Sequence, residues 1–129
     1  MKRLVANRIR TPDGTILQSY YTHDYRVHKD KNGLEYMVDG GNEYLRRTVH
    51  PDAPYTELSV YDTDPFDMIR LAFCWGTRGK DGNQSLKWVA LCNLETSHIE
   101  AIIETQTHVP EHLLNIFKTE LEWRQRSES

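Results

Sequence analysis

Two polar clusters between Tyr20 and Arg47 contain the residue types and spacings that could do chemistry. The first has the sequence YYTHDY (20–25), and the second, VDGGNEYLRR (38–47), joins an Asp-Gly-Gly bend to two adjacent arginines. Glycine lets the backbone approach another group closely, and a guanidinium offers forked donors that suit phosphate or carboxylate. We therefore predict a ligand-binding site formed by His23, Asp24, Tyr25, Asp39, Gly40, Gly41, Tyr44, Arg46 and Arg47.

Each residue type in this set has an expected task. The paired arginines would hold an anion, and the glycines would let backbone N–H groups approach it. The histidine and the aspartates would fix the pocket, and the tyrosines would stack on a base. Alternatively, both arginines form salt bridges with Asp24, Asp39 or Glu43 and join neighbouring hairpins without any ligand.

The His23-Asp24 pair indicates a second function class, a small metal-dependent phosphodiesterase or nuclease that uses His23 with Asp24 or Asp39. Such a site needs further ligands, and the six histidines show no His-Glu-x-x-His spacing. His108 and His112 are four residues apart, but a proline between them is expected to begin a helix that excludes His108. A nucleophile elbow and a phosphate-binding glycine loop are also absent from the sequence. We predict no metal, no cofactor and no catalytic residue.

Composition and charge limit the classes of partner. Hydrophobic residues make up 38% of the 129 residues, which is enough for a modest core. Residues 1–50 carry nine Lys/Arg and six Asp/Glu, whereas residues 51–129 carry seven and thirteen, so we do not expect non-specific nucleic-acid binding. No run approaches the roughly 20 apolar residues of a membrane span, and the start lacks the apolar part of a signal peptide. We expect a cytoplasmic protein without membrane contact.

The elements that must position the predicted site are β-hairpins. Residues 8–17 read as one hairpin with a Pro-Asp-Gly turn, and residues 25–38 read as another with an Asn-Gly turn. Residues 44–47 continue as a short strand or a single helical turn. A later hairpin runs between Trp75 and Trp88, and it would bring Cys74 and Cys92 near its base as free thiols rather than a disulfide.

Helices are predicted mostly in the second half of the chain. One begins at Asp64-Pro65 with Asp64 as the N-cap, and another begins at the capping-box sequence SHIE (97–100). The last helix starts at Pro110 and has Glu120 and Arg124 as a pair on its exposed side. Its apolar face is formed by Leu113, Leu114, Phe117 and Leu121.

These elements predict an α+β fold with N-terminal antiparallel β-hairpins, a middle helix and hairpin, and a C-terminal helical hairpin. The expected organisation is a single domain, residues 1–129, with a β-rich part (1–61), a helix plus hairpin (62–93) and a helical hairpin (94–129). In a third interpretation the helical hairpin docks on a partner or on a second copy to form a homo-oligomer, with Trp123 as its anchor.

The motif Tyr-x-x-His-Asp-Tyr is followed by Val-Asp-Gly-Gly-x-x-Tyr-Leu-Arg-Arg and then by ELSV (57–60). Over residues 7–61 these motifs resemble a family of small, mostly uncharacterised proteins of bacteriophages and prophages. A looser likeness covers residues 75–79 and the chain from Ser97 onward. Some relatives carry cysteine pairs at the turns that here are Thr11–Gly14 and Lys29–Gly33, which implies zinc knuckles in those members. This chain has no cysteine there, so no metal is carried over.

The resemblance implies a phage origin and supplies no established activity. With the predicted site, it leads us to expect a phage accessory protein of the counter-defence type that acts by binding without catalysis. The expected ligand is an anionic small molecule, of which a nucleotide signal of host immunity is one example. The alternatives are an inhibitor that binds a host protein and the phosphodiesterase or nuclease described above.

Overall fold

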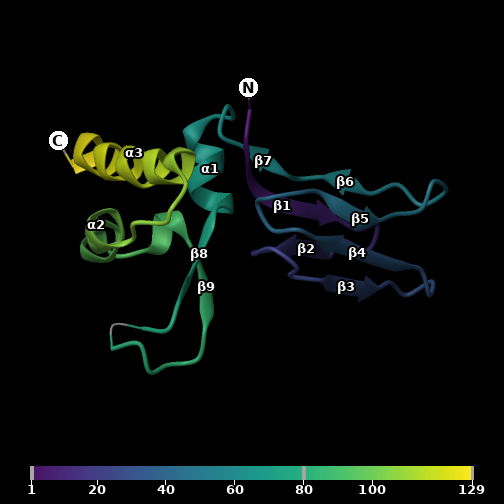
Figure 1. Cartoon of the computed structure of the whole chain (residues 1–129). Coiled ribbons are helices and arrows are strands. Elements are labelled where there is room, and N and C mark those ends of the chain that lie inside the picture. Colours follow the sequence, from purple (N-terminus) through teal and green to yellow (C-terminus); the bar gives the residue numbers. More distant parts are fainter. Residues whose placement is uncertain (1, 80, 129) are drawn as a thin grey trace. The chain divides into compact units, whose positions relative to one another are not determined.

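The computed structural model describes residues 2–79 and 81–128, and the chain folds into two compact units. Unit 1 is Met1–Asp64 and unit 2 is Pro65–Ser129. The β-rich part that the sequence predicted ends at residue 61, close to the end of unit 1. Antiparallel strands come first and helices come mostly last, which confirms the predicted α+β class (Figure 1).

The described part of unit 1 is built from strands. They are β1 (Leu4–Arg10), β2 (Ile16–Ser19), β3 (Arg26–Lys29), β4 (Glu35–Asp39), β5 (Arg46–Thr48), β6 (Thr56–Glu57) and β7 (Val60–Tyr61). One antiparallel sheet has the order β2-β1-β6, with β7 also paired to β1, and the other has the order β3-β4-β5 (Figure 1). Both predicted hairpins are therefore confirmed, and the segment that the sequence left open is a strand, β5.

Each hairpin turn ends in a glycine with a positive φ, a backbone conformation that other residues rarely adopt. Gly14 has φ +91°, and its N–H donates to the carbonyl of Thr11. Gly33 has φ +83°, and its N–H donates to the carbonyl of Asp30 in the same way. The carboxylate of Asp30 also accepts from the backbone N–H of Asn32, at 2.9 Å, which holds the second turn.

The core of unit 1 lies between its two sheets. Ile9 and Leu17 from the first sheet pack with Tyr36 and Val38 from the second, and all four are buried. Burying such a side chain contributes about 1.5–3 kcal/mol. The core therefore fixes which face of each sheet points inward, and with it the side on which the polar clusters meet.

A side-chain clamp joins the first turn to strand β3 of the other sheet. Asp13 accepts from the hydroxyl of Thr11 and contacts the imidazole of His28 on β3, at 2.8 Å from Oδ2 to Nε2. These two partners hold the pKa of the Asp13 carboxyl well below its ordinary value.

Unit 2 places a β-hairpin among helices. Its described elements are α1 (Phe66–Ala72), β8 (Cys74–Thr77), β9 (Lys87–Ala90), the short 3-10 helix η1 (Leu91–Asn93), α2 (Thr96–Thr105) and α3 (Glu111–Glu128) (Figure 1). The predicted hairpin is confirmed as β8–β9, with Trp75 opposite Val89 and Gly76 opposite Trp88. Cys74 and Cys92 are not joined in a disulfide.

The core of unit 2 contains a charged cluster that contradicts one prediction. Glu120, which we expected on the exposed side of the last helix, is fully buried. It accepts two hydrogen bonds from Arg70 on α1, both 2.8 Å long, and one from Arg124, at 2.7 Å. Helical spacing correctly paired Glu120 with Arg124, but it gave no sign that α1 would cover this side of α3 and bring a second arginine.

The pKa of Glu120 follows from this environment. Burial raises the pKa of its carboxyl, but the hydrogen bonds from Arg70 and Arg124 outweigh the burial, so the net pKa is lowered. Arg124 also donates to the Thr96 hydroxyl, at 2.9 Å, and to the carbonyl of Leu91, at 3.1 Å. The cluster therefore joins α1, η1, α2 and α3 within one unit.

Two helix starts differ from the prediction. Asp64 does not cap α1, because its Oδ2 accepts from the backbone N–H of Tyr61 and the residue at the N-cap position is Pro65. The capping box predicted at Ser97 is also wrong, because α2 begins one residue earlier, at Thr96, with Glu95 at the N-cap. At the start of each of these two helices, the N-cap residue has an extended backbone and its side chain makes no capping hydrogen bond.

Trp123, the expected partner anchor, contacts other side chains of unit 2. Its ring lies 5.6 Å from that of Phe66, and the guanidinium of Arg70 lies over it at 5.3 Å. This packing gives Trp123 a structural role inside its own unit.

Among the described helices, none is long and apolar enough to cross a membrane.

Candidate functional site

The two polar clusters of unit 1 meet in the fold, and the loops that carry them bind each other. The hydroxyl of Ser19 donates to the carbonyl of Asp24, at 2.7 Å, and accepts from the backbone N–H of Gly41, at 2.9 Å. One buried hydroxyl thus joins the loop 20–25 to the loop 40–45. The two segments of the predicted site therefore lie next to each other in the fold.

The glycines of the second loop allow a close approach, but the neighbour is the chain itself. Gly41 has φ +54°, and a Cβ there would collide with the backbone of Tyr21. Gly40 has φ +109°, and a Cβ there would collide with the carbonyl of Tyr44. Both glycines are therefore explained by loop packing, which differs from the ligand approach that we expected.

A buried asparagine supports the same junction, and sequence reasoning missed it. The side-chain amide of Asn7, on β1, donates to the carbonyls of Asp39, at 2.8 Å, and Tyr44, at 3.2 Å. Its Oδ1 accepts from Nη2 of Arg47, at 2.9 Å. Asn7 is fully buried, so its partners replace the water that it loses on folding.

Arg47 points into this network. Its guanidinium pairs with Glu57 and donates to Asn7 and to the hydroxyl of Ser59, at 3.1 Å, and its side chain is only 13% exposed. The expectation that both arginines hold one anion needs correction here. Because adjacent residues of β5 point to opposite faces, Arg47 joins the two sheets while Arg46 faces the other way.

His23 and Asp24 also have separate tasks. The carboxylate of Asp24 is buried, and it accepts from the backbone N–H of Tyr20, at 2.8 Å, and from Nε of Arg26, at 2.7 Å. His23 is exposed and has φ +68°, which is uncommon for a residue other than glycine, and its Nδ1 lies 3.1 Å from the hydroxyl of Tyr44. Asp24 therefore shapes the loop, while the strained His23 stands on its surface.

The accessible part of the predicted site lies at the end of the β3-β4-β5 sheet. Asp39 and Arg46 are cross-strand partners, and extending the β3–β4 register one residue beyond the Arg26–Val38 pair would place Tyr25 in the same row. Arg46 is 67% exposed and Tyr25 is 56% exposed. The ion pair between Arg46 and Asp39 is a long one, 3.5 Å from Nη1 to Oδ2.

Asp39, in the middle of this row, has a carboxylate oxygen that accepts no hydrogen bond within the described part of the chain. Its side chain is buried, and its Oδ1 has no hydrogen-bond partner among the described residues. The Nε of Arg47, on the inner face of the same sheet, is likewise without a partner in that part of the chain.

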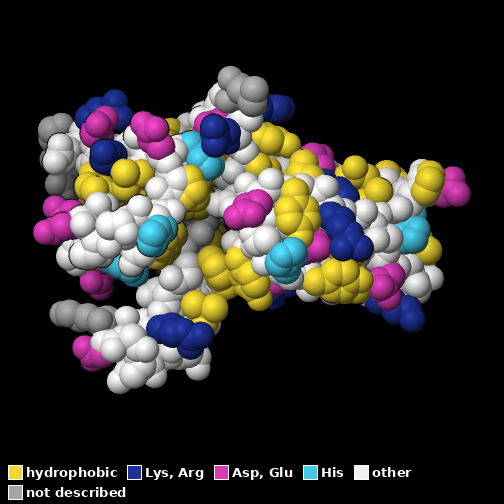
Figure 2. Space-filling view, in the orientation of Figure 1, with side chains coloured by type: hydrophobic (Ala, Val, Ile, Leu, Met, Phe, Trp, Pro, Cys, Tyr) yellow, Lys and Arg dark blue, Asp and Glu magenta, His cyan; other side chains and the backbone are white. Residues whose placement is uncertain are grey.

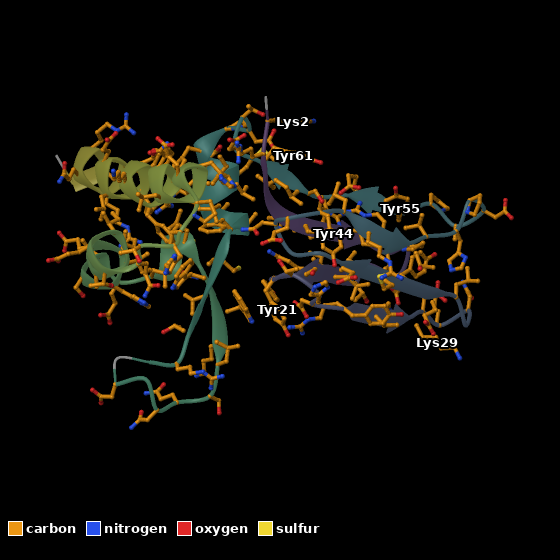
Figure 3. The ribbon with its side chains drawn as sticks, viewed as in Figure 1. Lys2, Tyr21, Lys29, Tyr44, Tyr55 and Tyr61 are labelled. Atoms are coloured by element: carbon orange, nitrogen blue, oxygen red, sulfur yellow. The ribbon has the colours of Figure 1, made fainter. Side chains whose placement is uncertain are left out.

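Exposed hydrophobic and aromatic side chains surround the row. We use the name loop rim for the accessible set Tyr21, His23, Tyr25, Leu45 and Arg46, in which Tyr21 is 47% and Leu45 is 44% exposed. In Figure 3, Tyr21 and Tyr44 lie toward the end of unit 1 where the two loops meet, and Lys29 marks the opposite end. On the face of unit 1 seen in Figure 2, basic, acidic and hydrophobic side chains are intermixed rather than sorted into one basic field.

The two polar residues that support the junction, Asn7 and Ser19, occupy core-facing positions that a sequence pattern can reveal. Asn7 and Ser19 are direct partners in the register of β1 and β2, and they share strand parity with Ile9 and Leu17 of the core. A polar residue at a core-facing position needs buried partners. That rule, applied to the predicted hairpin 8–17 and its extensions, would have pointed to Asn7 and Ser19.

Within residues 2–79 and 81–128, no group of three or more His, Cys, Asp or Glu side chains is arranged to hold a metal ion. Comparison of the chain with models of known protein families, with curated proteins and with solved structures found no match.

Proposed function

We propose that this protein acts by binding without catalysis, and that the loop rim contacts an anionic ligand of the nucleotide class. One observation carries the proposal: Arg46 on β5 and Tyr25, one residue before β3, are both exposed at the same end of the β3-β4-β5 sheet. A guanidinium binds phosphate through paired, charge-assisted hydrogen bonds. An aromatic ring at the same end of the sheet offers a stacking surface for a base.

The support around the rim favours a preformed contact surface. Asn7, Ser19 and Asp24 fix the loops by buried hydrogen bonds, and they hold His23 at a positive φ. Strained residues of this kind persist where the surrounding structure determines them, and they cluster at binding sites. A ligand that meets this surface would therefore lose little affinity to ordering the loops.

In the setting that the sequence resemblance implies, the ligand would be a nucleotide signal of host immunity, bound in the cytoplasm of an infected cell. Two free thiols suit such a reducing compartment. Binding of this signal would lower its free concentration, which is the counter-defence activity that we propose.

The test is a thermal-shift titration of the whole protein with cyclic dinucleotides and with ADP-ribose. We expect one of these ligands to raise the melting temperature, and Arg46→Ala to weaken its binding by about 10- to 100-fold, since a hydrogen bond to a charged group contributes about 1.5–3 kcal/mol. Arg10→Ala removes another exposed arginine of unit 1, on β1, and serves as the matched control. Absence of a shift with every nucleotide, or an equal effect of both substitutions, would contradict the proposal.

Chromatography of the same mixtures separates binding from turnover. We expect the ligand to be recovered unchanged. Hydrolysis that is lost in His23→Ala would instead support the phosphodiesterase or nuclease.

A partner protein is the second candidate, favoured by the hydrophobic side chains around Arg46. Tyr and Arg are enriched among the residues that dominate protein interfaces, and Tyr21, Tyr25 and Leu45 are all more than 40% exposed. Affinity capture from host-cell lysate, with wild-type protein and the double variant Tyr25→Ala/Leu45→Ala as baits, tests this version. A protein retained by the wild type and lost with the variant would support it, whereas equal capture by both would contradict it.

A further inference from the structure

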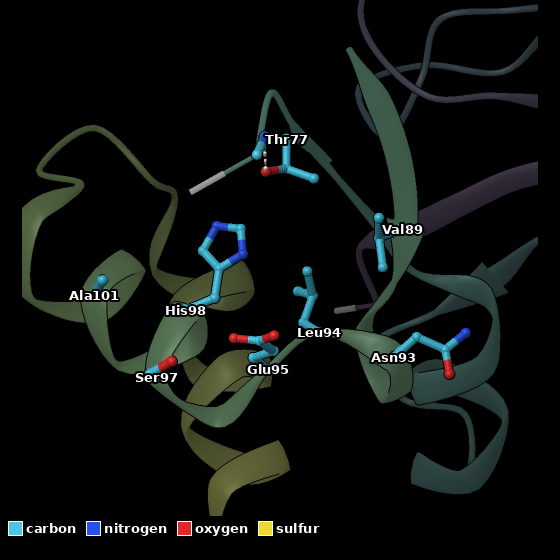
Figure 4. Close-up of a pocket in the computed structure, with 9 residues that line it drawn as sticks. Thr77, Val89, Asn93, Leu94, Glu95, Ser97, His98 and Ala101 are labelled. Atoms are coloured by element: carbon cyan, nitrogen blue, oxygen red, sulfur yellow. Dashed lines mark hydrogen bonds between the residues drawn. The ribbon is translucent and has the colours of Figure 1, made fainter. Parts of the chain in front are cut away.

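A cavity of about 510 Å³ lies within unit 2, between the β8–β9 hairpin and the start of α2 (Figure 4). Pockets that bind small molecules typically have volumes of roughly 300–1,000 Å³. Part of the lining is apolar and comes from Val89 on β9, Leu94 after η1 and Ala101 on α2. These residues offer a surface for an apolar body of about the size of a bicyclic ring.

The polar side of the cavity holds groups that the protein leaves unused. Among the described residues, the side chains of Asn93, Glu95, Ser97 and His98 make no hydrogen bond or ion pair. The hydroxyl of Thr77 accepts from the backbone N–H of Gly79, at 3.2 Å, so its own proton remains to be donated. In Figure 4 the His98 ring projects from α2 toward Thr77, and the Glu95 side chain lies below it, on the side away from Thr77.

Charge decides which ligand suits these groups. Glu95 is the one acidic residue among the described residues of the lining, and these residues include no lysine or arginine that could pair with it. The N-terminus of a helix favours a negative charge, and Glu95, at the N-cap position of α2, supplies that charge. A ligand that covered this carboxylate without a positive group would remove its water and give nothing in return.

We propose that this cavity binds a small organic cation, namely a primary amine carried on an apolar aromatic body. The ammonium group would lie against the carboxylate of Glu95. The ring would pack on Val89 and Leu94 and against the imidazole of His98. This site belongs to unit 2 and is independent of the loop rim, so either proposal can fail alone.

The test uses three probes that share one ring system and differ in charge: tryptamine, its neutral analogue tryptophol and the anion indole-3-acetate. Binding to the full chain is measured by amide chemical-shift titration in NMR. We expect saturable binding of tryptamine, roughly tenfold weaker binding of tryptophol and still weaker binding of indole-3-acetate. The amide shifts should lie around the cavity.

Variants then assign the site. Glu95→Gln should weaken tryptamine roughly tenfold and remove the preference over tryptophol, whereas Glu100→Gln, on the exposed part of the same helix, should change neither. Ala101→Phe adds a large ring to the lining and should weaken binding of all three probes, with circular dichroism verifying that each variant is folded. The proposal is overturned by no saturable binding of tryptamine, by indole-3-acetate binding as tightly, or by Glu95→Gln without effect.

Discussion

Replacing the buried carboxylate of unit 2 should cost much of the stability of that unit. Glu120 is fully buried and accepts three charge-assisted hydrogen bonds from Arg70 and Arg124, between 2.7 and 2.8 Å long. Glu120→Ala removes the acceptor and leaves two guanidinium groups without their partner. Breaking a buried ion pair in this way costs about 3–5 kcal/mol, against a total stability of about 5–15 kcal/mol for a domain.

Tryptophan fluorescence can follow this loss during urea unfolding. Trp75, Trp88 and Trp123 all belong to unit 2, so the signal reports on that unit and not on unit 1. Glu122→Ala, an exposed glutamate two residues away on the same helix, is the control and should change the free energy of unfolding by less than about 0.5 kcal/mol. A loss below about 1 kcal/mol for Glu120→Ala would refute the reasoning.

The pH dependence gives an independent check on the same cluster. Because the pKa of Glu120 is lowered in the folded state, its contribution is present above the ordinary pKa of an unfolded glutamate, roughly 4.3, and is lost as the pH falls toward the folded value. The free energies of unfolding of the wild type and of Glu120→Gln should therefore differ at pH 7 and converge in acid. A difference that stays constant with pH would contradict the ionic account.

Three further predictions concern unit 1 and can be measured by far-UV circular dichroism or amide exchange. Asn7→Ala should destabilise unit 1 by about 2–4 kcal/mol, since it leaves the carbonyls of Asp39 and Tyr44 without their buried donor, and a loss under about 1 kcal/mol would contradict the network. Gly41→Ala should cost more than Gly33→Ala, because both have positive φ but only a Cβ at position 41 meets the backbone of Tyr21; equal costs would disprove the close approach. Asp13→Asn should remove the clamp to His28 and reduce the acid sensitivity of unit 1, because the lowered pKa of Asp13 makes its contribution present near neutral pH and lost as the pH falls; unchanged acid sensitivity would count against it.

The fold class and the hairpins could be predicted from the sequence because their signals are local. A glycine at the end of each turn sets the chain reversal, and alternation around Ile9 and Tyr36 sets the inner face. The helix starts were harder to predict. Asp64 and Ser97 match capping patterns, but the N-cap residues of α1 and α2 are Pro65 and Glu95.

The chemistry of the site was harder to predict because it depends on long-range contacts. The sequence predicted the correct segments, yet Arg47 and the two glycines serve the internal junction. Of the predicted set, His23, Tyr25 and Arg46 are exposed. The same limit applies to Glu120, whose helical partner was visible in the sequence while Arg70, fifty positions away, was not. Local spacing predicts neighbours along one element, and tertiary packing decides which of them meet solvent.

The most direct measurement for the central proposal is an NMR titration of the ¹⁵N-labelled chain with the nucleotide that gives the largest thermal shift. We predict saturable chemical-shift changes confined to the loop rim, strongest at Tyr25 and Arg46 and absent in Arg46→Ala. No saturable change, or changes that map to residues away from the two loops, would contradict it.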